Sequence, residues 1–192
     1  MFLATILNEP ICQPIKKRYE LWSKFMEENV EFWLPDSEWH AKAHSGRVLL
    51  LALLIGYQKG LSDEELEKLG IVAVFHDSRR LDDGVDKGHG SRAAEYYKDY
   101  CLEQNLHFDA HAYHIIYHHD QDDSIGLAEI EKFPTINERG MLLYQIFKDA
   151  DALDRFRLGP EALDENFLRT KEAYELVGFA KKLLQNSNEA NV

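Results

Sequence analysis

Cysteine and proline are scarce in this chain, which contains two cysteines and five prolines. Cys12 and Cys101 are too few for a disulfide framework and do not form a metal-ligand pair, so a reducing compartment is expected. The prolines stand at expected boundaries between elements: Pro10, Pro14, Pro35, Pro134 and Pro160. The long intervals without proline are compatible with helices, because proline breaks a helix interior.

Long apolar runs are absent as well. The longest, Val48 to Ile55, is far too short to cross a bilayer. The segment from Met1 to Ile11 is apolar, but it has no basic start and Asn8-Glu9-Pro10 interrupts it, so a secretory signal is not expected. The sequence therefore predicts a cytoplasmic protein that does not act at a membrane.

Positive charge is in deficit, with 22 Lys and Arg against 34 Asp and Glu and a formal net charge of -12. This balance argues against a nucleic-acid duplex or an anionic membrane as the main partner. A small phosphorylated substrate stays compatible with it, because a bound cation reverses the local field. Charge and composition leave the oligomeric state open.

Two sequence patterns with clear structural meaning are also missing. No alternation of apolar and polar residues indicates a sheet, and no Gly-x-x-x-x-Gly-Lys loop indicates a nucleotide-triphosphate motor. We predict one all-α domain over residues 1–192, with a core at about 36–160 and C-terminal helices at 160–186. Helices are expected over residues 38–59, 63–76, 91–104, 109–120 and 139–156, with an irregular, glycine-containing segment from Arg79 to Gly90.

Two local patterns predict where helices begin. Asp36-Ser37-Glu38 is a candidate N-terminal cap for the first of these helices. Ser62, followed three residues later by Glu65, has the spacing of a capping box.

The most informative feature is His76-Asp77, which follows the apolar run Ile71 to Phe75. Imidazole and carboxylate together bind divalent cations. Adjacent helical residues point about 100° apart, so both can reach one ion only where the helix ends. The glycine-containing segment that follows fits such an end. A capped helix terminus with a surface aspartate is the alternative, and the apolar turns before it argue against that alternative.

His44 is a further ligand candidate, because it leads directly into the apolar run from Val48 to Ile55. His40 lies one helical turn before it, and Arg47 follows three residues after it on the same face. This face can present a ligand and a cation to one pocket. For His40 alone we favour the interpretation that it belongs to a solvated helix start.

The last ligand candidates lie in the acidic segment from Lys148 to Asp154. Leu143, Phe147 and Ala150 belong to the buried stripe of this helix, and Asp151 and Asp154 lie together at its edge. Spacing does not decide between these two aspartates.

Other histidines offer a second set of ligands. His89 stands between two glycines, and four histidines recur on one helical face at intervals of four, three and four: His107, His111, His114 and His118. We interpret His107 and His111 as an amphipathic edge. His118 is the functional candidate, because Ile115 to Tyr117 surround it with apolar bulk. A second metal ion or a direct contact to phosphate are both open.

The ordered set His44, His76-Asp77 and Asp151 resembles the HD-domain superfamily of metal-dependent phosphohydrolases. The resemblance extends from about Trp39 to Gly159 and is greatest to small, poorly characterised HD proteins. It includes a His-x-x-x-His-x-x-Arg-Val stretch at His40 to Val48, His-Asp-x-x-Arg at His76 to Arg80, and Asp-Gly-x-Asp-x-x-His-Gly at Asp83 to Gly90.

The resemblance implies an all-helical fold around a central metal pocket. It implies that four residues hold the first ion: His44, His76, Asp77 and Asp151. It thereby favours Asp151 over Asp154. Binuclear branches of the family add histidines, and His89 and His118 are the candidates here. The chain lacks the Gly-Tyr-Pro signature of cyclic-di-GMP phosphodiesterases and the glutamate that follows His-Asp in the 5′-deoxynucleotidase branch.

The expected activity is hydrolysis of a phosphate mono- or diester by water bound to one or two divalent ions of manganese, iron, cobalt, nickel or zinc. Asp77 is expected to orient the water, and His118 or His119 to protonate the leaving oxygen. Arg47, Arg79 and Arg80 are candidates to neutralise phosphate oxygens, and Arg80 fits the family pattern best. Two alternatives are a di-iron oxygenase of the HD-like fold and a non-catalytic module that binds a nucleotide or a partner.

Overall fold

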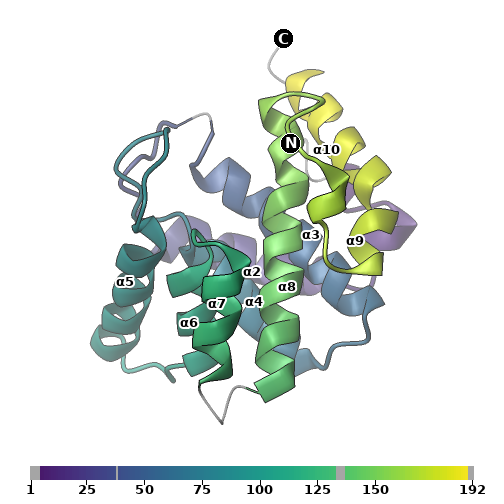
Figure 1. Cartoon of the computed structure of the whole chain (residues 1–192). Coiled ribbons are helices and arrows are strands. Elements are labelled where there is room, and N and C mark those ends of the chain that lie inside the picture. Colours follow the sequence, from purple (N-terminus) through teal and green to yellow (C-terminus); the bar gives the residue numbers. More distant parts are fainter. Residues whose placement is uncertain (1–4, 38, 133–136, 190–192) are drawn as a thin grey trace.

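The computed structural model describes residues 5–37, 39–132 and 137–189, and all regular structure in these ranges is helical (Figure 1). The prediction of an all-α class is therefore confirmed. In chain order the elements are η1 (Pro10–Cys12), α2 (Lys16–Asn29), α3 (Lys42–Gln58), α4 (Asp63–Phe75), α5 (His89–Glu103), α6 (Ala110–His118), α7 (Asp123–Glu131), α8 (Asn137–Leu153), η2 (Asp154–Leu158), η3 (Glu165–Phe167), α9 (Lys171–Glu175) and α10 (Val177–Glu189).

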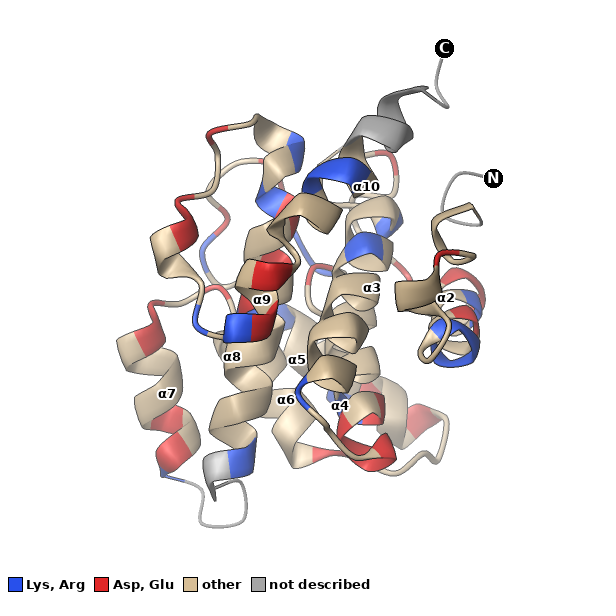
Figure 2. Cartoon of the chain, turned by 90° about the vertical axis from the view of Figure 1, so that its right-hand side faces the viewer, with Lys and Arg blue, Asp and Glu red and all other residues tan. Residues whose placement is uncertain are grey.

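Helix α3 lies at the centre of the molecule. It is buried from His44 to Gly56, and it packs most extensively against α4 and α8. A helix that is apolar all round belongs in the core, and the run Val48 to Ile55 has that character. Figure 2 shows acidic residues on α4, α7 and α9, whereas α3 is uncharged along most of its length.

Of the two helix starts predicted from capping patterns, one is confirmed and the other is wrong. The Ser62–Glu65 capping box at the start of α4 is confirmed, with both of its hydrogen bonds formed. The predicted start at residues 36–38 is wrong, because α3 begins at Lys42. The Ser37 hydroxyl instead accepts hydrogen bonds from the backbone of Trp39 and His40 and donates one to Asp83, which forms a turn before the helix. Glu38 lies outside the described residues.

Other boundaries shift by a few residues. Helix α5 begins at His89 rather than Ser91, after Gly88, whose φ of 86° is left-handed. Helix α7 was not predicted; Gly126 and Ile130 are its buried residues, so its sequence carries little apolar periodicity. The helix predicted over 139–156 ends as an α-helix at Leu153 and continues as the 3-10 helix η2 from Asp154.

The C-terminal segment is attached to α8 by a buried carboxylate. Asp149 is 0% exposed and accepts hydrogen bonds from the backbone N–H groups of Arg169 and Thr170 and from the Thr170 hydroxyl. Helix α9 then packs against α8, and α10 packs against η2 and α9 (Figure 1). Helix α10 continues to Glu189, three residues past the predicted end.

Two further predictions concern the whole chain. Within the described residues, none of the helices is both long enough and apolar enough to cross a membrane. Cys12 and Cys101 are buried free thiols.

Candidate metal centre

The polar residues at the end of α4 are buried. The helix ends at Phe75, and His76 is its C-cap residue. His76 is 0% exposed and Asp77 is 5% exposed. A charge at such a depth needs partners, because burying it alone is costly. The partners come from α3, α5, α6 and α8.

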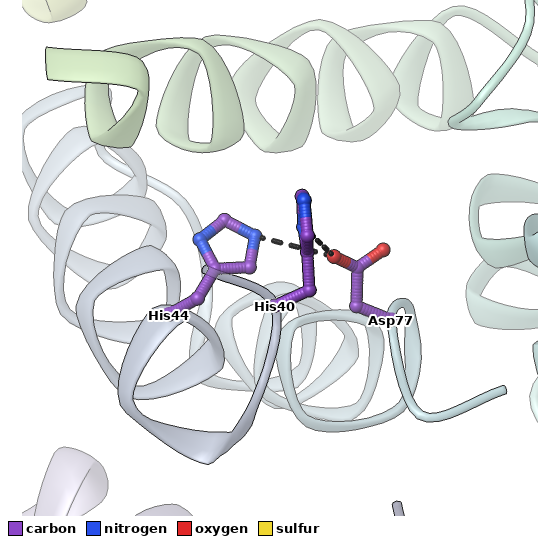
Figure 3. A group of neighbouring side chains, drawn as sticks. All are labelled: His40, His44 and Asp77. Atoms are coloured by element: carbon purple, nitrogen blue, oxygen red, sulfur yellow. Dashed lines mark hydrogen bonds and ion pairs between the residues drawn. The ribbon is translucent and has the colours of Figure 1, made fainter. Parts of the chain in front are cut away.

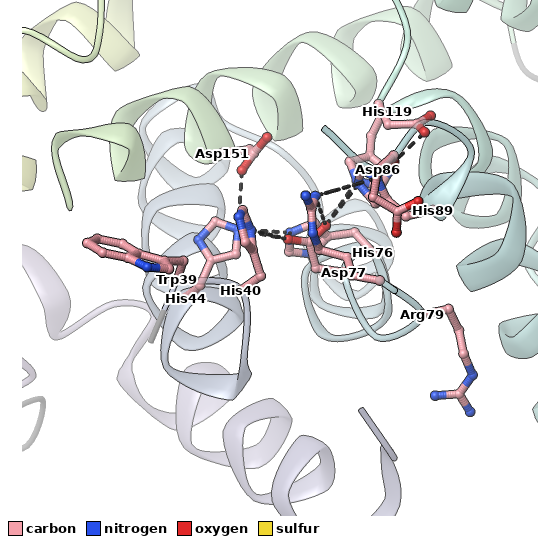
Figure 4. A network of polar contacts seen from close by, with 12 residues as sticks. Trp39, His40, His44, His76, Asp77, Arg79, Asp86, His89, His119 and Asp151 are labelled. Carbon is pink, nitrogen blue, oxygen red and sulfur yellow. Dashed lines mark hydrogen bonds and ion pairs between the residues drawn. The ribbon is translucent and has the colours of Figure 1, made fainter. Parts of the chain in front are cut away.

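Helices α3 and α8 complete the first group of ligand atoms. His44 Nε2 lies 3.2 Å from His76 Nε2 and 3.3 Å from Asp151 Oδ1. It is also 3.6 Å from Asp77 Oδ2. Figure 4 shows Asp151 reaching down from α8 toward His44. The structure thus brings together the four residues that the sequence predicted as ligands.

The hydrogen bonds of the two histidines decide which nitrogen is available. His76 Nδ1 lies 2.9 Å from the carbonyl oxygen of Ala73, and His44 Nδ1 lies 2.7 Å from Asp154 Oδ2. Both partners only accept, so both Nδ1 atoms carry hydrogen and donate. In the neutral rings the two Nε2 lone pairs then face each other at 3.2 Å. Two lone pairs at this distance require a cation between them, and a metal ion fits that requirement.

The pKa values of His76 and Asp77 also favour metal binding by these two residues. Burial lowers the pKa of His76 to about 3, so this ring is neutral at pH 7. Burial raises the pKa of Asp77, but the neighbouring His76 and hydrogen bonds from His119, His40 and His89 outweigh burial and hold that pKa well below its usual value. A neutral imidazole and an ionised carboxylate are the forms that bind metal.

Two carboxylates favour the protonated form of His44. Burial lowers its pKa, but hydrogen bonds to Asp151 and Asp154 outweigh burial and raise it. The hydrogen bond to His44 in turn lowers the pKa of Asp151 against the opposing effect of burial. A metal ion that binds His44 Nε2 would compete with a proton on the same atom.

A second group lies on the other side of Asp77. His89 Nε2 and His119 Nε2 lie 3.0 Å and 3.5 Å from Asp77 Oδ1, and 3.0 Å from each other. Each donates from Nδ1 to a backbone carbonyl at 2.7 Å, that of Asp86 for His89 and that of Ile116 for His119. Both Nε2 atoms therefore face Asp77 Oδ1 and each other, and Asp77 lies between both groups.

Arg80 borders this second group. Its Nη1 lies 3.7 Å from Asp77 Oδ1 and 3.3 Å from His89 Nε2. Its Nη2 donates to the carbonyl of Gly84 at 2.7 Å, which fixes the guanidinium. The residue predicted as catalytic is therefore in contact with the centre, and its positive charge faces the side on which a second ion would bind.

Three other predicted site residues face elsewhere. Arg47 forms a two-pronged ion pair with Asp154, through Nε at 2.6 Å and Nη2 at 3.0 Å. Arg79 lies over the ring of Tyr96, 3.3 Å from its centroid, and Figure 4 shows it turned away from the cluster. His118 pairs through Nδ1 with Gln121 Oε1 at 3.0 Å. The structure brings His119, rather than His118, to Asp77.

His40 and Asp154 also lie at the centre, although the sequence favoured a solvated position for His40 and the resemblance favoured Asp151 over Asp154. His40 Nδ1 lies 3.1 Å from Asp77 Oδ2, and Figure 3 shows His40 and His44 on the same side of this carboxylate. His40 precedes α3, so the helical spacing used to compare it with His44 does not apply. Asp154 is 1% exposed and holds His44 rather than facing the ligand atoms.

Comparisons of the chain with protein-family models, with curated proteins and with solved structures find no match in any of the three. The functional assignment therefore depends on the geometry of the centre and on the sequence motifs.

The described residues contain three overlapping groups whose ligand atoms lie close enough to hold a metal ion. They are His40, His44 and Asp77; His44, His76 and Asp151; and His76, Asp77 and His119. Imidazole nitrogen and carboxylate oxygen in this mixture suit first-row transition metals. These largely buried histidines and aspartates could therefore hold a metal ion.

Proposed function

We propose that this chain is a metal-dependent phosphohydrolase that hydrolyses a small phosphate mono- or diester, and that it belongs to the HD-domain superfamily that its motifs resemble. The observation that carries the proposal is the set of close contacts around His44 Nε2, which lies 3.2 Å from His76 Nε2, 3.6 Å from Asp77 Oδ2 and 3.3 Å from Asp151 Oδ1. Hydrolysis is the chemistry that such a centre supports without any further cofactor.

The first ion would be held by His44, His76, Asp77 and Asp151. A divalent ion bound by such residues lowers the pKa of a water ligand toward neutrality and polarises a phosphoryl oxygen. Asp77 is suited to orient the attacking water, because Oδ1 and Oδ2 contact different groups of histidines. Arg80, next to Oδ1, supplies positive charge for the phosphoryl oxygens.

The experiment is a hydrolysis assay on the full chain reloaded with manganese, cobalt, iron or zinc. The substrates are p-nitrophenyl phosphate, bis-p-nitrophenyl phosphate and a set of nucleoside monophosphates. We expect turnover that Asp77→Asn abolishes and Asp122→Asn leaves unchanged, because Asp122 is an exposed carboxylate outside the centre. Metal-loaded protein without turnover of any ester would contradict the proposal and favour a non-catalytic binding module.

A second candidate function is oxygen-dependent oxidation by two irons. The observation that favours it is the position of Asp77, which contacts His44 through Oδ2 and His89 and His119 through Oδ1 and so lies between two histidine groups. Two equivalents of iron together with oxygen uptake would support this function. Ester turnover with one equivalent of metal would exclude it.

A further inference from the structure

Arg157, in η2, lies at the metal centre and is fixed there by backbone oxygens. Its Nε donates to the carbonyl of Trp39 at 2.9 Å, and its Nη1 donates to the carbonyl of Asp154 at 3.2 Å. Nη1 is also 3.4 Å from the Asp154 carboxylate. These contacts engage Nε and Nη1 and leave Nη2 directed toward His40.

Arg157 Nη2 faces His40 Nδ1, an atom that is also in contact with Asp77. Arg157 Nη2 lies 3.4 Å from His40 Nδ1, and the same nitrogen lies 3.1 Å from Asp77 Oδ2. When Nδ1 carries hydrogen and donates to Asp77, it cannot accept from Arg157. No other acceptor for Nη2 occurs among the contacts of the described residues. A buried guanidinium edge without an acceptor is costly unless a ligand supplies one.

Nη2 faces His40, which together with Asp151 is more exposed than His44 and Asp77. The Asp151 side chain is 33% exposed and that of His40 is 13% exposed, whereas those of His44 and Asp77 are 1% and 4% exposed. Burial lowers the pKa of Arg157 below its usual value, against the opposing charges of Asp154, Asp151 and Asp77.

We propose that Arg157 binds an oxyanion of the substrate, a phosphoryl oxygen, through Nη2 on the His40 side of the metal centre. This inference rests on the proposed phosphohydrolase function. Guanidinium N–H groups match phosphate oxygens in geometry and charge. Arg80 faces Oδ1 of Asp77, and Arg157 faces the histidine on Oδ2, so a phosphoryl group at the centre has a guanidinium on each side.

The test uses inorganic phosphate as the probe and the manganese-loaded full chain as the protein. Calorimetry measures phosphate affinity for wild type, Arg157→Met, Arg157→Lys and the matched control Arg155→Met. Arg155 shares η2 but donates to the carbonyl of Ala162, away from the centre. We expect Arg157→Met to weaken phosphate binding roughly 10- to 100-fold, Arg157→Lys to retain part of it, and Arg155→Met to change nothing.

Metal content, measured on the same samples, separates the explanations. The proposal requires that Arg157→Met keeps its manganese while it loses phosphate affinity. Loss of manganese from Arg157→Met would show that Arg157 acts only by supporting Asp154. Equal phosphate affinity in wild type and Arg157→Met would show that Arg157 does not contact the anion. Either result overturns the inference about Arg157 and leaves the proposed function standing. Manganese-loaded wild type that binds no phosphate would overturn the proposed function as well.

Discussion

Asp151 and Asp154 are three residues apart, yet they contact opposite nitrogens of the same histidine. Asp151 lies 3.3 Å from His44 Nε2, and Asp154 lies 2.7 Å from His44 Nδ1. The change from α8 to η2 at Asp154 accompanies this difference. Spacing alone left the two aspartates tied, because their separation places them on one side of an ideal helix. Both belong to the centre: Asp151 as a ligand candidate and Asp154 as a positioning residue.

Asp154→Asn tests this division of roles. The amide keeps the size of the side chain but removes the charge that fixes the His44 tautomer and pairs with Arg47. Loss of such a supporting carboxylate typically costs about 10- to 100-fold in metal affinity. Chelator competition on folded protein measures it, with Asp122→Asn as the control. Unchanged metal affinity in Asp154→Asn would show that His44 needs no support from this side.

Of the adjacent histidines His118 and His119, only His119 contacts Asp77, whereas His118 pairs with Gln121. Adjacent residues near a helix end point about 100° apart, so only one of them faces a given neighbour. The apolar residues Ile115 and Ile116 are both fully buried, so they do not single out one of the two histidines. The sequence favoured His118, while the rotation of α6 against α5 directs His119 toward Asp77.

At the scale of elements, the approach of α5 to α6 determines whether the second histidine group forms. A Cβ atom on Gly90 would lie 2.7 Å from the carbonyl oxygen of Ile116 and 2.9 Å from that of Tyr117. These are backbone atoms, so the helices themselves would have to move apart. His89, at the start of α5, would then move away from His119.

We therefore expect Gly90→Ala to lower the free energy of unfolding by about 1–3 kcal/mol and to weaken binding of a second metal ion. The first group, on α3, α4 and α8, should keep its ion. Gly178→Ala is the control, because a Cβ atom there has open space. Urea unfolding and metal titration measure both effects. Equal stability of the two variants would contradict the close packing of α5 on α6.

Glu65 connects α4 to α8 and gives stability a pH dependence. Its ion pair with Arg139, aided by hydrogen bonds from Ser62, lowers its pKa from 4.5 to about 2 in the folded chain. The folded state thus binds this proton less readily than the unfolded state. The stabilisation is present above about pH 4.5 and is lost as the pH falls toward 2.

Glu65→Gln keeps the capping-box geometry and removes the charge. We expect it to be less stable than wild type at pH 7, with the difference disappearing in acid. Unfolding curves from pH 7 to about pH 2 measure this difference, and Glu64→Gln, whose parent carboxylate is 82% exposed, is the control. A difference that is constant with pH would show that the ion pair contributes nothing.

The elements differ in how far the sequence predicts them, for physical reasons. Ser62 and Glu65 interact within one turn, so the start of α4 can be predicted from local sequence. Ser37 looks like a similar cap, but its hydroxyl donates to Asp83, which is distant in sequence and cannot be anticipated. Helix α7 buries little, so its stability depends on neighbours such as Tyr144 of α8 rather than on its own periodicity.

At the scale of the whole molecule, the centre forms only when α3, which carries His44, packs beside the segment that carries Asp154. His44 and Asp154 are 110 residues apart in the chain, so the unfolded chain has no preformed site. Metal binding is then coupled to folding. An ion present at 100 times its dissociation constant would stabilise the folded chain by about 2.7 kcal/mol.

Removal of metal should therefore lower the melting temperature, and readdition should restore it. We expect this shift in wild type and its loss in His76→Ala, which removes a ligand candidate that is 0% exposed. Calorimetric scans with chelator and with added manganese measure it. A chelator-induced shift of equal size in His76→Ala would place the stabilising ion elsewhere.

The most direct test of whether His44, His76, Asp77 and Asp151 hold a metal ion is elemental analysis of the full chain purified without chelator. We expect at least one equivalent of transition metal per chain in wild type and loss of that equivalent in Asp77→Asn. A second equivalent would assign His89 and His119 to a second ion. No metal in wild type, even after reloading with manganese, cobalt or zinc, would contradict the account.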